Sequence, residues 1–340
     1  MFCLLEAPKH PCPRLSRGAL AMVRHRLSAV VGETVQVGQF DATDRPVLTV
    51  NCCDEIDLQT LSLWGGRVTA DMSADDVWRV RSEHSGAGPH SLTGPIAVRG
   101  ARVGDVVRIK ILGARPARHG FNVVSPGTAS RGVLADRFPA GFVRHFTVDD
   151  AGRTAQSGRI SVPINPFPGF IAVAAPRNGP HSSIEPGRFG GNLDIKDLVP
   201  GATLLLPVFR DKALIWVGDG HLAQGNGEVD GTAIEAGLDS IRIQIGVERG
   251  LRLHTPRWFN ADHLASIGLA RNLDTAVRSA VADMVDWLGE LGVAQEDAYL
   301  LCSVGAEMSV SQVVNGVKGV HFRLAHALIP ADVQFRHRCP

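Results

Sequence analysis

The chain has 340 residues, enough for one large domain or two modest ones. Its 35 lysines and arginines nearly balance its 34 aspartates and glutamates, and no basic block is interleaved with aromatic residues, so we expect no nucleic-acid partner. No apolar run approaches the roughly 20 residues that a helix needs to cross a bilayer, so we expect no membrane partner either.

Residues 1–22 carry several prolines among charged residues, which predicts a flexible N-terminal extension ahead of a single domain over residues 23–340. The apolar start of the chain breaks at Glu6 and Pro8 and is too short for a signal-peptide core. The six cysteines form no CxxC pair or regular framework, which is typical of free thiols in a reducing compartment. The sequence therefore predicts a cytoplasmic protein.

Many short strands separated by turns follow from Val35 onward. In Ser240–Gly246, for example, three isoleucines alternate with polar residues, as in a strand with one buried face. Similar segments recur along the chain: Val47–Val50, Asp57–Leu63, Val106–Leu112, Ile160–Val162, Ile171–Val173, Leu204–Leu206 and Leu214–Val217. Strands this short and numerous predict a mainly β fold, with a β-sandwich or jelly-roll-like body and α+β decoration.

One amphipathic helix interrupts this pattern late in the chain. From Leu273 to Leu291, apolar residues recur at helical spacing and form one stripe. Asn272 or Asp274 can cap its start, and Gly292 can end it. A shorter helix is expected after Ala294, so we expect late helices packed on the β body.

The densest run of chemically capable residues lies in two glycine-rich segments, GGNLDIKDL (190–198) and VGDGHLAQGNGEVDGTAIE (217–235). The glycines allow close backbone approach to a ligand. The acidic residues and the histidine supply oxygen and nitrogen ligands for a divalent metal. The spacing lacks the HExxH pair of many zinc enzymes, so the second segment alone is equally typical of a surface loop whose polar groups satisfy its own turns.

The order of these motifs resembles the acetamidase/formamidase family. GGNxD is followed by LPV at 206–208, then by GDxHxxQGxGE and GTAIE, as in that family. Further segments are similar to family motifs: TGP at 93–95, GARVGD at 100–105, LADRF at 134–138, PFPG at 166–169 and SQVVN at 311–315. The resemblance covers roughly residues 24–330.

Two positions depart from the family pattern. Asn226 stands where the family has Asp in QGDGE, which removes one negative charge. The segment Leu61–Arg67 replaces the Asp-Ala-x-Gly-Gly-Gln segment that many members carry. The first departure affects activity if the Asp binds metal or steers a proton, whereas Asn serves as well if the Asp only makes a turn. The second departure indicates either a different substrate pocket or a subgroup of the family.

The resemblance implies a metal-dependent hydrolase that cleaves the C–N bond of small linear amides, such as formamide or acetamide, and releases ammonia. In this interpretation Asp194 and His221 hold the metal, and Glu228 acts as general base beside His221. Three further residues are expected to bind the substrate: Asn192, Gln224 and Asp219. Four others are weaker candidates for the site or its entrance: His181, Asp136, His84 and His90.

The expected cofactor is a divalent metal, zinc in first place with calcium as the alternative, and the resemblance implies a homo-oligomer. Other hydrolase plans fit poorly: there is no GxSxG elbow for a serine nucleophile, and Cys302 follows apolar neighbours that indicate a buried thiol. Two alternatives stay open. One is hydrolysis of a lactam or another small C–N substrate, and the other is a non-catalytic metal- or ligand-binding relative.

Overall fold

The structure, a computed structural model, describes residues 22–84, 86 and 88–330. The extension expected over residues 1–22 falls, apart from Met22, outside the described residues.

Strands dominate the first half of the described chain, with two α-helices and two 3-10 turns between them. These elements are β1 (Arg24–Leu27), β2 (Val35–Val37), β3 (Gln39–Phe40), β4 (Leu48–Val50), β5 (Glu55–Thr60), α1 (Leu63–Gly66), α2 (Ala74–Glu83), β6 (Ser91–Val98), β7 (Val106–Val124), η1 (Gly127–Ala129), η2 (Ala135–Arg137), β8 (Phe142–Val148), β9 (Thr154–Ser157), β10 (Ile160–Pro163) and β11 (Phe167–Val173).

The second half adds further strands and the two late helices. They are β12 (His181–Ser182), β13 (Gly190–Asn192), β14 (Thr203–Pro207), β15 (Ile215–His221), β16 (Glu235–Glu248), β17 (Arg257–Phe259), β18 (His263–Ala270), α3 (Leu273–Glu290), α4 (Gln295–Gly305), β19 (Ala306–Gln312), β20 (Lys318–Ala325) and η3 (His326–Leu328).

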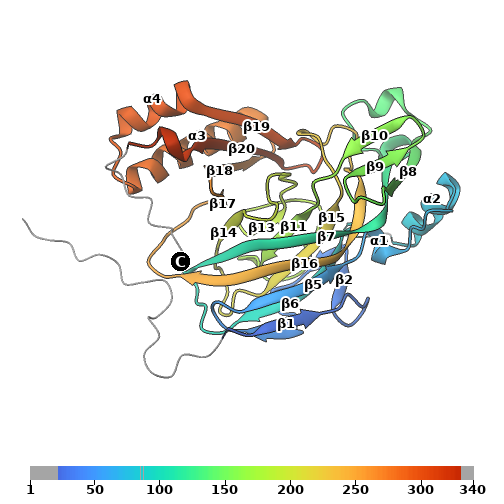
Figure 1. Ribbon diagram of the computed structural model, residues 1–340, viewed down its shortest axis with the longest axis horizontal. Coiled ribbons are helices and arrows are strands. Elements are labelled where there is room, and N and C mark those ends of the chain that lie inside the picture. Colours follow the sequence, from blue (N-terminus) through green and yellow to red (C-terminus); the bar gives the residue numbers. More distant parts are fainter. Residues whose placement is uncertain (1–21, 85, 87, 331–340) are drawn as a thin grey trace, which may run out of the picture.

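The body of the fold is a β-sandwich (Figure 1). One layer runs β1–β5–β16–β7–β14, and the other runs β6–β15–β11–β13 with β2 and β4 along the free edge of β6. Aliphatic side chains from both layers fill the space between them, among them Ile241, Ile243 and Ile245, the predicted buried face of β16. The mainly β prediction is confirmed.

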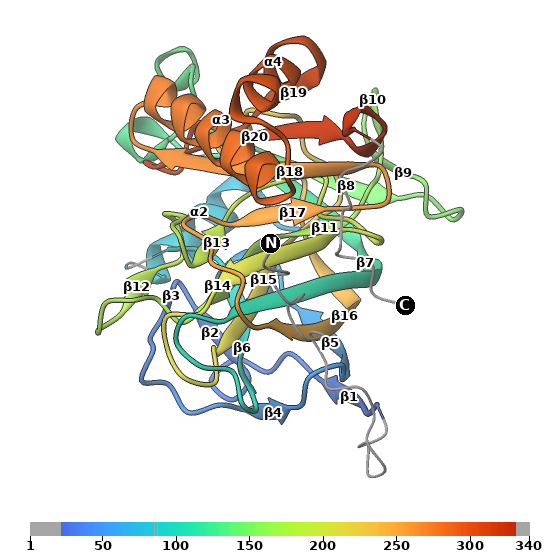
Figure 2. The same ribbon diagram turned by 90° about the vertical axis from the view of Figure 1, so that its left-hand side faces the viewer.

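The first layer continues beyond β14 as β17–β18–β20–β19, and α3 and α4 cover this extension (Figure 2). Asn272 caps α3 as predicted, because its side-chain oxygen accepts a hydrogen bond from the Thr275 backbone N–H at 3.0 Å. A second apolar core lies between these helices and strands, with Met284 and Leu288 fully buried. The expected packing of late helices on a β body is confirmed.

No helix in the described part of the chain is both long and apolar enough to cross a membrane. The helix α2, which the strand pattern did not indicate, begins with a capping box in which Ser73 and Asp76 bond each other's backbone. It lies near β8 at the far end of the molecule from α4 (Figure 1).

The two layers meet where β15 pairs with β16 at one position, His221 opposite Glu235. On its other side β15 pairs with β11, where Phe167 stands opposite His221. Strand β13 lies next to β11 and leads directly into Asp194. This corner therefore brings the two glycine-rich segments together.

Candidate active site

Asp194, Asp219 and His221 converge at this corner, all three almost completely buried. His221 Nε2 lies 3.4 Å from Asp219 Oδ1, and His221 Nδ1 lies 4.0 Å from Asp194 Oδ1. The ligand atoms of the three side chains all lie within 4.8 Å of one another. The structure thus joins Asp194 and His221, the two predicted metal ligands, and adds Asp219, which the sequence assigned to the substrate.

Strand β11 leaves room for this cluster at Gly169. A Cβ at this position would lie 2.6 Å from Asp194 Oδ1, Asp219 Oδ2 and His221 Cε1 alike. Such a distance is well below van der Waals contact, so only glycine lets the three side chains close over the strand. Gly169, the last residue of the PFPG motif, therefore serves the site because it has no side chain.

Two glutamates also lie against the histidine. Glu228, His221 and Glu235 form a second buried group of ligand atoms within 4.8 Å of one another. Glu235 Oε2 lies 3.3 Å from His221 Nε2, and its Oε1 accepts a hydrogen bond from the Ala233 N–H. Glu235 was quoted in the GTAIE motif but given no role, and the strand pairing with His221 is what reveals it.

Three of the clustered acids adopt a backbone conformation that side chains other than glycine rarely take. The φ angles of Asp194, Asp219 and Glu228 are 50°, 56° and 48°. Each such residue costs on the order of 1–3 kcal/mol and persists only where its surroundings hold it in place. Strain concentrated on the clustered acids marks this corner as functional.

Neighbouring side chains orient the acids. Asn315 Nδ2 donates a hydrogen bond to Asp194 Oδ2 at 2.6 Å, and Gln224 Nε2 donates to the backbone carbonyls of Asp194 and Ser311 at 2.9 and 3.3 Å. Gln224 Oε1 and Asn192 Oδ1 are buried with no hydrogen-bond partner among the described atoms. These two predicted substrate-binding residues thus lie beside Asp194 with acceptor oxygens to spare.

His90, a weak candidate from the sequence, faces the cluster. Its Nε2 lies 3.9 Å from Asp219 Oδ2, and its Nδ1 lies 2.8 Å from the hydroxyl of buried Ser183. The buried imidazole of His321 on β20 lies between the Ser311 hydroxyl on β19 at 2.9 Å and the Asp197 carboxylate at 3.2 Å. These contacts hold the segment after β13, which carries Asp194, against β19 and β20.

Crowding of acids shifts the pKa values. Burial raises the pKa of Asp194 to about 8 and that of Glu235 to about 7, and repulsion from Asp219 adds to both. Burial and the Asp194 charge raise the pKa of Glu228 well above its usual range. Burial opposes the shift of Asp219, but the charges of His90 and His221 lower the pKa of its carboxyl to about 2. Burial also opposes the shift of His221, but Glu235 and Asp219 raise the pKa of its imidazole well above the usual range.

These residues fit a divalent cation. Buried ligand atoms without a hydrogen-bond partner point into the cluster from all five side chains: Asp194 Oδ1, Asp219 Oδ1, both ring nitrogens of His221, Glu228 Oε2 and Glu235 Oε2. Buried polar atoms are normally paired, so a set of orphans this dense calls for a partner. Carboxylate oxygens with an imidazole suit zinc, and the excess of oxygen also suits calcium.

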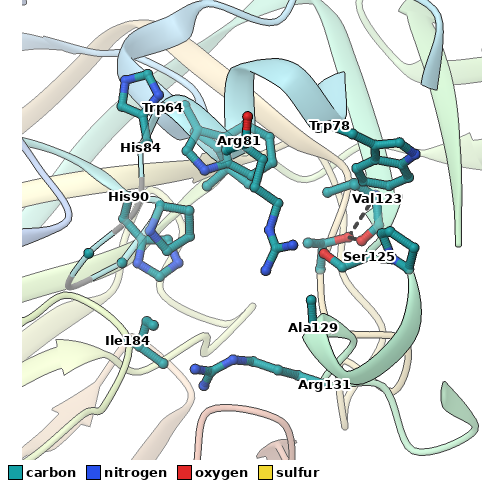
Figure 3. Close-up of a pocket in the computed structure, with 18 of the residues that line it drawn as sticks. Trp64, Trp78, Arg81, His84, His90, Val123, Ser125, Ala129, Arg131 and Ile184 are labelled. Carbon is teal, nitrogen blue, oxygen red and sulfur yellow. Dashed lines mark hydrogen bonds between the residues drawn. The ribbon is translucent and has the colours of Figure 1, made fainter. Parts of the chain in front are cut away.

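A cavity of about 430 Å³ borders the cluster, and Figure 3 shows its lining. His90 and Asn315 belong to its wall, and they contact Asp219 and Asp194 respectively. Trp64, from the segment Leu61–Arg67 that departs from the family pattern, also lines it with a φ of 54°. The departure predicted to alter the pocket therefore lies in its wall.

The other sequence candidates lie elsewhere. Asn226 is exposed in a turn and is not part of the cluster. The family Asp that it replaces therefore does not correspond to any of the clustered candidate metal ligands. Asp136 is exposed on η2, and His181 pairs with β3 beside Phe40. His84 lines the cavity rather than the cluster. Burial raises the pKa of the Cys302 thiol to about 11, which makes it a poor nucleophile.

Comparison with known proteins identifies relatives of this chain. A model described as the acetamidase/formamidase family matches residues 43–182 and 178–334. A formamidase of Methylophilus methylotrophus is 23% identical over 82% of this chain and 84% of its own length.

Solved structures are similar over nearly their whole length. An acetamidase from Bacillus halodurans superposes with a TM-score of 0.77 at 28% identity, covering 88% of this chain and 97% of its own. A predicted acetamidase/formamidase from Thermoanaerobacter tengcongensis superposes with a TM-score of 0.80 at 28% identity, covering 91% of this chain and 97% of its own.

Proposed function

The chain belongs to the acetamidase/formamidase family, and from this premise we propose that it is a metal-dependent hydrolase of small linear amides that releases ammonia. The observation that carries the metal dependence is the buried group of Asp194, Asp219 and His221, whose ligand atoms lie within 4.8 Å of one another and include four that lack a hydrogen-bond partner: Asp194 Oδ1, Asp219 Oδ1 and both ring nitrogens of His221.

Asp194, Asp219 and His221 would hold the cation, with zinc as the first choice. This assignment moves Asp219 from the substrate to the metal. A bound divalent cation acidifies water to a pKa of about 7 and draws charge from a carbonyl oxygen. The fit rests on the orphaned atoms of these three side chains and on their convergence over Gly169.

Glu228 is the proposed general base. Its Oε2 is buried without a hydrogen-bond partner. Both oxygens of Glu235 have close neighbours instead, because Oε1 accepts a hydrogen bond from the Ala233 N–H and Oε2 lies 3.3 Å from His221 Nε2. The raised pKa of Glu228 favours a carboxyl that takes a proton from water and returns it to the leaving nitrogen. The proton that Glu228 takes from water is therefore the one it gives to the amide nitrogen, which must be protonated before it leaves.

Asn192 and Gln224 are proposed to orient the amide. A primary amide carries two N–H donors, and these side chains offer two buried acceptor oxygens beside Asp194. Gln224 is fixed for this role because its Nε2 is held by two backbone carbonyls. A substrate that lacks N–H donors would leave both oxygens unpaired and bind less well.

The test is ammonia release from formamide, acetamide and propionamide, with 2-pyrrolidinone as a lactam, by protein loaded with zinc or calcium and by protein treated with a chelator. We expect turnover of linear amides that the chelator abolishes and added metal restores. Glu228→Gln is expected to lower kcat by about 10²–10⁴-fold with unchanged metal content. Exposed Glu296 on α4 gives the matched control, Glu296→Gln, with full activity.

Absence of turnover on every amide by fully metallated protein would refute the proposal and favour a non-catalytic binding relative. The motive for that alternative is weakened because Asn226 lies outside the cluster. We also propose a homo-oligomer, supported by the family resemblance, and a cytoplasmic location, supported by the absence of a CxxC pair or regular cysteine framework from the sequence. Light scattering and cell fractionation test them.

A further inference from the structure

Two arginines face each other across the cavity beside the cluster. Arg81 comes from the last turn of α2, and Arg131 comes from the loop after η1. Figure 3 shows both side chains extending into the cavity from opposite walls. The two elements are far apart in the sequence, and the fold brings their guanidinium groups to the same cavity.

Neither guanidinium has an acidic partner. Across the described ranges, no carboxylate lies within 4.0 Å of either group, whereas Arg67 and Arg79, near the same helix, each pair with an acid. Asp230 also lines the cavity, but its carboxylate accepts hydrogen bonds from Asn122 and from the Thr232 backbone N–H. Two guanidinium groups against this one carboxylate leave the cavity lining with excess positive charge.

The two charges act on each other. Burial and the neighbouring charge of Arg131 lower the pKa of Arg81. His90 lines the same cavity as the two arginines, and its Nε2 lies 3.9 Å from Asp219 Oδ2. The cavity therefore shares a wall residue with the surroundings of the cluster. Like charges facing one cavity are destabilising unless an anion lies between them.

About half of the wall is apolar, and Leu63, Trp64, Trp78 and Val123 supply this part of the lining. A short aliphatic chain can contact these side chains while an anion on it meets the arginines. Guanidinium groups match a carboxylate because their N–H donors pair with its two oxygens.

We propose that this cavity binds a carboxylate on the substrate itself, so that the preferred substrates are monoamides of short dicarboxylic acids. The proposal rests on the proposed amide hydrolysis at the neighbouring cluster. Water adds to the amide carbon, the C–N bond breaks, and the nitrogen leaves as ammonia with a proton from water. The products are the dicarboxylate and ammonium.

Isosteric substrate pairs test this. Malonamate, succinamate and glutaramate are each compared with the neutral diamide of the same length. We expect kcat/KM to favour at least one anionic monoamide on the order of tenfold or more, because a hydrogen bond to a charged carboxylate is stronger than one to a neutral amide. Arg81→Gln and Arg131→Gln should each remove most of this preference while the neutral diamide changes little. Arg131→Lys should recover part of it.

Arg79→Gln is the matched control, because Arg79 lies on the same helix, is exposed and pairs with Asp76. It should keep the full preference. Equal kcat/KM for each anionic and neutral pair, in wild type and variants that are all folded by circular dichroism, would overturn the proposal.

Binding of succinate and butyrate to zinc-loaded protein, measured by calorimetry, separates this proposal from the proposed reaction. We expect succinate to bind more tightly than butyrate to the wild type and equally to the Arg81→Gln, Arg131→Gln double variant. That result without any amide turnover would refute the reaction and support the anion site. Equal binding of the two acids to the wild type, or tighter binding of inorganic phosphate than of succinate, would refute the carboxylate site even if amides are hydrolysed.

Discussion

Asn315 donates a hydrogen bond to Asp194 across 121 positions of sequence, from Nδ2 to Oδ2 at 2.6 Å. The bond occupies one carboxylate oxygen and leaves Oδ1 directed at Asp219 and His221 over Gly169. Partners of this kind fix the orientation of a metal ligand. A residue from the loop after β19 therefore completes a site built by β13 and β15.

Replacing Asn315 should accordingly weaken metal binding. We expect Asn315→Ala to reduce the affinity for zinc by about 10- to 100-fold, because Asp194 loses the bond that holds its carboxylate. Competition with a fluorescent chelator measures the affinity. Asn226→Ala is the control, since Asn226 is exposed in a turn outside the cluster. Equal affinities of the two variants would contradict the role of Asn315.

The convergence of Asp194 and His221 could be predicted because both lie in motifs whose order matched a known family. The amphipathic stripe of α3 and the alternation in β16 were also readable, since both report burial of one face. The bond from Asn315 to Asp194 was not, because a contact between residues 121 positions apart leaves no local periodicity. The cavity was missed for the same reason: α2 and the loop after η1 contribute its arginines independently.

Asp219 shows that a sequence motif can locate a residue in the site without identifying the role of that residue. Its place next to His221 in the sequence was compatible with a substrate contact. Strand alternation puts Asp219 and His221 on the same face of β15, and Asp194 reaches that face from the end of β13. Only the strand pairing shows that the three side chains meet.

Filling the space above Gly169 should disable the site. In Gly169→Ala, the new methyl group would lie 2.6 Å from three cluster side chains, so they must move apart. We expect kcat/KM to fall by at least about 100-fold, with a stability loss of about 1–3 kcal/mol from overpacking. Gly225→Ala is the control within the motif region, because nothing lies within 4 Å of a Cβ there. Comparable activity of both variants would show that the cluster tolerates the methyl group.

Metal removal should make stability depend on pH. Without a cation, the raised pKa values of Asp194, about 8, and Glu235, about 7, mean that the folded state holds protons that the unfolded state has lost. Stability is then highest below the unfolded pKa values near 4 and falls as pH rises toward 8. The lowered pKa of Asp219, about 2, acts only below pH 4.

Thermal unfolding of chelator-treated protein between pH 5 and 8 checks this. We expect its Tm to fall across the range, while metal-loaded protein changes much less because the cation replaces the protons. The gap between the two curves should therefore widen with pH. A metal-free Tm that rises with pH would show that these carboxyls do not hold protons in the folded state.

A separate ion pair should anchor the late helices. Arg257 on β17 is 2% exposed and donates to both oxygens of Asp283 on α3, at 2.9 and 3.0 Å, and its guanidinium lies 4.9 Å from the Trp287 ring. Asp283→Ala would leave that guanidinium buried with only Glu290 as a partner. Breaking a buried pair by removing one partner costs about 3–5 kcal/mol, and Glu290 should keep the loss near the lower figure.

Urea unfolding of metal-loaded protein measures the effect of Asp283→Ala. Asp286 lies on the same helix but is exposed, so Asp286→Ala should change the free energy of unfolding by less than about 0.5 kcal/mol. Replacing both partners, Arg257→Leu with Asp283→Leu, should recover part of the loss, because no buried charge then remains. Amide turnover by folded protein should be unchanged in all three variants, since neither Arg257 nor Asp283 belongs to the metal cluster. If Asp283→Ala unfolds at the same urea concentration as Asp286→Ala, the buried pair does not hold α3 to the sheet.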